Sequence, residues 1–131
     1  YRHAYEHKVF LAQFEAIKKL AAEGPCVMVG RCADYALADN KRLFSVFLFM
    51  LIWTGGSSVL QANTIRHLKK PKDMITKTDK SRASYYNYYT NKKWGAASSY
   101  NLCVDSSKLG IDGAAKAIIQ AIEIFDSIKN K

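Results

Sequence analysis

The stretch Cys26–Gly30 (CVMVG) decides the fold class, because it is short, apolar throughout and ends abruptly at Arg31. A strand without polar alternation is typical of a parallel sheet that is covered by helices on both faces. Leu43–Phe49 is a second apolar run of this kind, and Tyr100–Val104 is a third. The sequence therefore predicts three short buried strands in an α/β layered domain.

Helical segments alternate with these strands. Upstream, four apolar residues recur at helical spacing before Gly24-Pro25 ends the helix, namely Phe10, Phe14, Ile17 and Ala21. Residues 63–90 carry mixed helical signals around Pro71. After Gly110, apolar residues at spacings of four, three, four and three predict a helix with one apolar face, formed by Ile111, Ala115, Ile118, Ile122 and Phe125.

The composition limits the class of protein. The 131 residues carry a net charge of +9, which favours anionic partners such as nucleotides, nucleic acid or an acidic membrane surface. The longest apolar run, Leu43–Trp53, is too short to span a bilayer, and no secretory signal is present. The chain starts at Tyr1 rather than Met, so we expect a fragment or a processed chain. Three cysteines without zinc-type spacing are expected to be reduced thiols of a cytoplasmic protein, namely Cys26, Cys32 and Cys103.

Polar clusters follow two of the predicted strands, at residues 30–35 and 105–108. Ligands of open α/β sheets bind beyond the carboxyl ends of the strands. Arg31 offers a planar fork for a phosphate, and Asp34 can accept a hydrogen bond from a base amino group or a ribose hydroxyl. The same two residues would equally suit a surface ion pair or a helix cap.

A third cluster occupies residues 77–86. Asp79 and Arg82 are three residues apart, so a helix presents them on one face. They form either an exposed ion pair, worth ~0.3 kcal/mol, or an arginine that reaches over phosphates while a carboxylate directs it. Lys80 adds a phosphate-binding cation to this segment. Phosphoryl transfer depends mainly on positioning and on neutralising charge, which is the chemistry that such side chains supply.

Large aromatic residues are concentrated just beyond this cluster, namely Tyr85, Tyr86, Tyr88, Tyr89 and Trp94. Interleaved with Lys92 and Lys93, they could stack the bases of single-stranded nucleic acid. The alternative is that they pack one helix onto its neighbour. The histidines have no partner at metal spacing, so no metal site is predicted.

Three segments in this order closely resemble the cytidylate kinase-like family: residues 24–35, 77–95 and 100–112. The resemblance implies a P-loop NTPase fold, a three-layer parallel sheet with flanking helices, whose N-terminal part is missing here. Residues 1–131 would then be one partial domain with a lid-type helical segment at about 66–95. The implied activity is transfer of the ATP γ-phosphoryl group to CMP or dCMP, with ATP and Mg²⁺ in the intact family member.

The same resemblance implies roles for individual residues. Arg31 and Asp34 would lie at the acceptor nucleotide. The segment that contains Asp79, Lys80 and Arg82 would be the lid that closes over the phosphates. The prediction requires that the three strands direct Arg31, Asp34 and Arg82 into one positively charged crevice.

Two features depart from the family pattern. No stretch reads Gly-x-x-x-x-Gly-Lys-Ser/Thr, and Gly55-Gly56-Ser57-Ser58 has no lysine, so the chain alone is predicted to lack kinase activity. Residues 50–68 also do not fit. The codons of Ala-Asp-Met-Asp-Trp-Arg, read one base later, can give the Leu-Ile-Trp-Thr-Gly-Gly of residues 51–56. We therefore expect a compensated frameshift, or a sequence error, between about residues 50 and 70.

Two other functions compete with the kinase interpretation. One is a nucleic-acid-binding module that uses the basic, tyrosine-rich stretch. The other is an inactive remnant that only packs against a partner.

Overall fold

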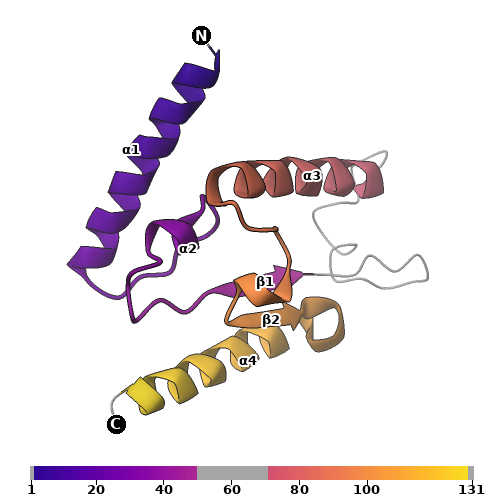
Figure 1. Cartoon of the computed structure of the whole chain (residues 1–131). Helices are drawn as coiled ribbons and strands as arrows, with labels where there is room; N and C mark the ends of the chain where they lie inside the picture. Colours follow the sequence, from indigo (N-terminus) through magenta and orange to yellow (C-terminus); the bar gives the residue numbers. More distant parts are fainter. Residues whose placement is uncertain (1, 50–70, 130–131) are drawn as a thin grey trace.

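The computed structural model describes residues 2–49 and 71–129 and has a mixed α/β architecture (Figure 1). In chain order the elements are α1 (Arg2–Glu23), α2 (Ala33–Ala36), β1 (Val46–Phe49), α3 (Pro71–Thr90), the 3₁₀ turn η2 (Ala97–Ser99), β2 (Leu102–Asp105) and α4 (Ser106–Lys129). In Figure 1, α4 runs below the small sheet and α3 runs above it.

The sheet of the described residues consists of β1 and β2, which pair in parallel from Val46 opposite Leu102 to Phe49 opposite Asp105. Side-chain hydrogen bonds hold the pairing at its start, where the Asn101 Oδ1 accepts from the Ser45 backbone N–H at 2.8 Å and from the Ser45 hydroxyl at 2.9 Å. The second and third predicted strands are therefore confirmed, as is their parallel direction.

The first predicted strand is wrong. Residues 26–30 form no strand, and Val27 and Val29 are 94% and 92% exposed. An apolar strand needs a neighbour that accepts its backbone hydrogen bonds and elements that cover its faces. Within the described residues, β1 pairs only with β2 and no strand lies beside residues 26–30. The prediction of burial on both faces also fails for β1, where Leu48 is exposed.

Helix α4 covers one face of the sheet and contacts both strands. It was predicted from Gly110 onward, and Gly110 has a left-handed φ of 69° that separates a first turn from the main helix. Ala114 is buried, and Phe125 packs against Phe44 with ring centroids 5.2 Å apart. However, Ile111 is exposed, so the predicted apolar face is partly wrong. A single sheet face covers only a narrow strip of a helix.

The described residues form two small core clusters, and the larger is aromatic. Phe10, Cys32 and Tyr86 are buried at its centre, and the surrounding half-buried residues are Phe14, Tyr85, Tyr89, Trp94 and Tyr100. The Phe10 and Tyr89 rings stack at 4.0 Å. This cluster joins α1 to α3. Helix α1 ends at Glu23, so the predicted helix that ends at Gly24-Pro25 is confirmed. The packing interpretation is confirmed for Tyr85, Tyr86, Tyr89 and Trp94, whereas Tyr88 is exposed.

A smaller core supports α2. Ile17 of α1 is buried against Ala33 and Ala36. All three cysteines are free, with Cys26 exposed and Cys32 buried. None of the helices in the described ranges combines the length and the apolar run that a bilayer crossing would need. The segment of the frameshift hypothesis, residues 50–70, lies outside the described residues.

Candidate functional site

The loop after residues 26–30 has an unusual backbone. Gly30, Arg31 and Cys32 have left-handed φ values of 70°, 56° and 56°. For residues other than glycine this conformation costs about 1 kcal/mol or more each. Burial of Cys32 and its carbonyl's hydrogen bond from the Ala36 backbone N–H, at 3.0 Å, hold the turn in place. The turn leads into α2 and leaves Arg31 exposed to solvent.

Asp34 lies on α2 between residues that anchor this short helix. Ala33 and Ala36 are buried against α1, whereas Asp34 is half-buried. Its Oδ2 accepts a hydrogen bond of 2.6 Å from the Tyr86 hydroxyl of α3, 52 residues further along the chain. Asp34 is therefore not a helix cap but the point at which the loop contacts α3.

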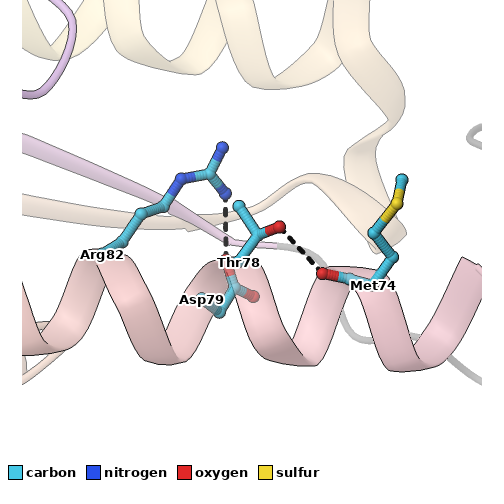
Figure 2. A network of polar contacts seen from close by, with 4 residues as sticks. All are labelled: Met74, Thr78, Asp79 and Arg82. Carbon is cyan, nitrogen blue, oxygen red and sulfur yellow. Dashed lines mark hydrogen bonds and ion pairs between the residues drawn. The ribbon is translucent and has the colours of Figure 1, made fainter.

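Helix α3 presents Asp79 and Arg82 on one face, as their spacing predicted. The Arg82 guanidinium donates to the Asp79 Oδ1 at 3.0 Å (Figure 2). One turn earlier, the Thr78 hydroxyl donates to the Met74 carbonyl at 2.8 Å. Both members of the ion pair are largely exposed, so the pair contributes only ~0.3 kcal/mol to stability. Arg82 can therefore exchange Asp79 for another anion at little cost, and Lys80 is exposed beside it.

The structure joins the two clusters through the tyrosines of α3. Arg82 and Tyr86 are four residues apart and so share a helix face, about 6 Å apart along the axis. Burial raises the pKa of the Tyr85 phenol, and the positive charge of nearby Arg31 opposes this effect. Arg31 and Asp34 thus both lie against α3, on the side of Tyr85 and Tyr86.

A hollow in the described residues lies apart from the residues of the predicted common crevice. A shallow hollow of about 290 Å³ lies at the end of α1, lined by Leu20, Glu23, Gly24, Pro25, Cys26, Val27 and Met28. None of Arg31, Asp34 and Arg82 lines it. In the polar cluster at residues 105–108, the Asp105 Oδ1 accepts from the Ser107 backbone N–H at 2.9 Å at the start of α4, and the Ser106 hydroxyl donates to the Phe49 carbonyl of β1 at 3.0 Å.

Sequence reasoning offered base stacking or packing for Tyr86 and missed its hydrogen bond to Asp34. Burial first, and then the hydrogen bond to Asp34, raise the pKa of the Tyr86 phenol, so the hydroxyl keeps its proton and donates. Burial also raises the pKa of the Cys32 thiol to about 11, with a smaller contribution from Asp34. The spacing of four residues placed Tyr86 on the helix face of Arg82, but no local pattern indicated its contact with Asp34.

Comparisons with known proteins agree with the sequence pattern. A family model described as "Cytidylate kinase-like family" matches residues 1–108. The chain is also similar to a solved crystal structure of an uncharacterized protein from Eubacterium ventriosum ATCC 27560. That match has 29% sequence identity and a TM-score of 0.77, and it covers 93% of this chain and 76% of the other. No curated protein matches.

Proposed function

The chain belongs to the cytidylate kinase-like family, and from this premise we propose that it forms the acceptor-binding and lid side of a nucleoside monophosphate kinase. Family membership itself indicates a kinase-related function with nucleotide substrates. The proposed reaction transfers the γ-phosphoryl group of ATP to CMP or dCMP. The proposed location is the cytoplasm.

One contact carries the proposal. The 2.6 Å hydrogen bond between Tyr86 and Asp34 joins the loop at residues 30–35 to the helix that bears Asp79, Lys80 and Arg82. Phosphoryl transfer requires an acceptor and a phosphate chain held at a defined distance, with the negative charge neutralised. A loop and a helix in direct contact can meet that requirement.

The acceptor side has two proposed contacts. The half-buried Asp34 carboxylate accepts a hydrogen bond from the cytosine amino group or a ribose hydroxyl. The exposed Arg31 guanidinium pairs with the phosphate of the acceptor, for which its planar fork is suited. Because Asp34 is held by α3, its carboxylate is oriented before the nucleotide arrives.

The lid side supplies positive charge. ATP as substrate brings the γ-phosphoryl group, and Arg82 and Lys80 neutralise charge on the phosphates while Asp79 directs Arg82. Among residues 2–49 and 71–129, no group of three or more His, Cys, Asp or Glu side chains could hold a metal ion. We assign no step to Mg²⁺.

We also propose that residues 26–30 and the two strands belong to a larger three-layer P-loop sheet. The exposure of Val27 and Val29 supports this, because it leaves an extended apolar segment without a neighbour. No Gly-x-x-x-x-Gly-Lys-Ser/Thr sequence occurs in the chain. The chain, with lid helix α3, accordingly acts as one partial domain that binds the acceptor but does not transfer the phosphoryl group by itself.

The test is calorimetric titration of the chain with CMP and dCMP. We expect saturable binding that Arg31→Ala and Asp34→Ala each weaken by about tenfold, the usual effect of losing a hydrogen bond to a charged group. Arg42→Ala is the matched control, because Arg42 is an exposed arginine that pairs with Asp126 of α4 at 3.8 Å. It should leave the affinity unchanged.

Two results would contradict the proposal. Failure of CMP and dCMP to bind at millimolar concentration would exclude the acceptor role. Salt-dependent binding of a single-stranded oligonucleotide that CMP does not displace would instead favour a nucleic-acid-binding module. CMP-dependent ATP turnover by the chain alone would disprove only the statement that it cannot transfer the phosphoryl group.

A further inference from the structure

We propose that Tyr86 is a positioning residue for the acceptor nucleotide, because its hydroxyl holds one oxygen of the Asp34 carboxylate and leaves the other to bind the ligand. This inference rests on the proposed function, in which Asp34 contacts the acceptor. It assigns to the tyrosine-rich stretch a role that neither base stacking nor packing of helices describes.

The geometry at Asp34 is specific. The Tyr86 hydroxyl donates to the Oδ2 at 2.6 Å, a length that is typical of a hydrogen bond to an ionised carboxylate. A carboxylate has two acceptor oxygens, so the Oδ1 remains available for a second donor. Asp34 is half-buried rather than enclosed, which leaves a side open to a ligand. The hydrogen bond therefore restricts the rotation of the carboxylate without consuming its capacity to accept.

Tyr86 itself is held firmly. Its side chain is 6% exposed and packs with Phe10 and Cys32 at the centre of the aromatic cluster. The ring of Tyr100 lies beside it, with centroids 6.2 Å apart and planes 24° apart. The Thr90 hydroxyl donates to the Tyr86 carbonyl at 2.7 Å. Because this side chain is confined, its hydroxyl has a fixed position. The hydrogen bond then fixes the orientation of the Asp34 carboxylate.

The arrangement also couples the two halves of the proposed site. Arg82 lies one turn before Tyr86 on the same face of α3. The residue that fixes the acceptor carboxylate is thereby part of the same rigid helix as the cation that faces the phosphates. Orientation of the acceptor and orientation of Arg82 follow from the position of one element.

The experiment compares CMP affinity in a double-mutant cycle of Tyr86→Phe and Asp34→Ala, measured by calorimetry on the complete chain. Tyr86→Phe keeps the ring in the aromatic cluster and removes only the hydroxyl. We expect it to weaken CMP binding about tenfold in the otherwise unmodified chain. In the Asp34→Ala background it should have no further effect on CMP affinity, since in this proposal the hydroxyl affects the ligand through that carboxylate. Tyr88→Phe is the matched control, because Tyr88 lies on the same helix and is 75% exposed.

The outcomes separate this inference from the proposed function. If the unmodified chain does not bind CMP, the proposed function fails and the inference fails with it. If the chain binds CMP and Tyr86→Phe changes the affinity equally in both backgrounds, or not at all, the inference alone is overturned.

A measurement on the unmodified chain covers the case in which Tyr86→Phe does not fold. The Tyr86 hydroxyl proton should give an NMR resonance that moves when saturating CMP is added, because the ligand binds the same carboxylate. The Tyr88 signals should stay in place. A Tyr86 resonance that does not respond to bound CMP overturns the inference.

Discussion

Residues 26–30 and residues 46–49 have the same apolar character, yet only the second segment forms a strand. Val27 and Val29 lie almost fully in solvent, whereas β1 pairs with β2 along its whole length and contacts α4. The difference lies in the partner. Backbone groups leave water only when another strand accepts and donates the hydrogen bonds that water would otherwise make. A strand is therefore a property of two segments, and an apolar sequence alone does not produce it.

The largest expected effect comes from placing a charge in each of the two regions. Val104 of β2 is 5% exposed, so Val104→Asp should destabilise the fold by about 3 kcal/mol or more, because it buries an unpaired carboxylate. Val27→Asp, the same change at an exposed position, should stay within about 0.5 kcal/mol. Urea denaturation monitored by circular dichroism measures both. Equal losses would mean that residues 26–30 are buried in solution and that the comparison is wrong.

The next largest effect is expected in the alkylation rates of two thiols, because Cys26 starts the unpaired segment and Cys32 follows it. Cys26 is exposed, whereas Cys32 is buried with its pKa raised from 9.0 to about 11. At pH 8 the lower thiolate fraction alone should slow alkylation of Cys32 about 100-fold relative to a thiol with the unshifted pKa. Mass spectrometry after timed alkylation would check the order of labelling.

The pH dependence of Cys32 has a definite sign. The folded state favours the neutral thiol, so the contribution of Cys32 to stability is complete below pH 9 and is lost as the pH rises toward 11. Over the same range, its alkylation rate should increase steadily. Labelling of Cys32 as fast as Cys26 at pH 8 would contradict the burial of the loop after residues 26–30.

The smallest effect concerns the hydrogen bonds that start the strand pair. Asn101→Ala removes the acceptor for both Ser45 donors and should destabilise the fold by about 1 kcal/mol, because the site is exposed. Asn101→Asp keeps an acceptor oxygen at the same position and is the matched control, with a smaller expected loss. Urea midpoints would separate the two variants. Equal loss in both would show that the oxygen does not hold the pairing.

Local patterns predicted the long helices and two of the strands, but not the short helix α2. The spacing of Phe10, Phe14 and Ile17 marked the buried face of α1, and the spacing of Asp79 and Arg82 placed them on one face of α3. These predictions succeeded because an α-helix converts sequence distance directly into a face. The roles proposed for these side chains in binding remain predictions, which the titrations above address.

The sequence could not reveal contacts made between distant segments. The hydrogen bond from Tyr86 to Asp34 joins residues 52 positions apart, and the left-handed backbone at Arg31 and Cys32 depends on burial that no local pattern encodes. The prediction of the buried face of α4 failed for the same reason. Its apolar residues extend around more of the helix than the small sheet covers, so Ala114 is buried while Ile111 is exposed.

By itself, the amino-acid sequence indicated the long helices but not the short α2, and it determined which side chains share a helix face and to which family the motifs are similar. Only the tertiary structure decided which apolar segment pairs as a strand and which tyrosine holds Asp34. The physical reason is that periodicity and propensity act over a few neighbouring residues. Strand pairing and burial, in contrast, depend on surfaces that segments far apart in the chain supply to one another.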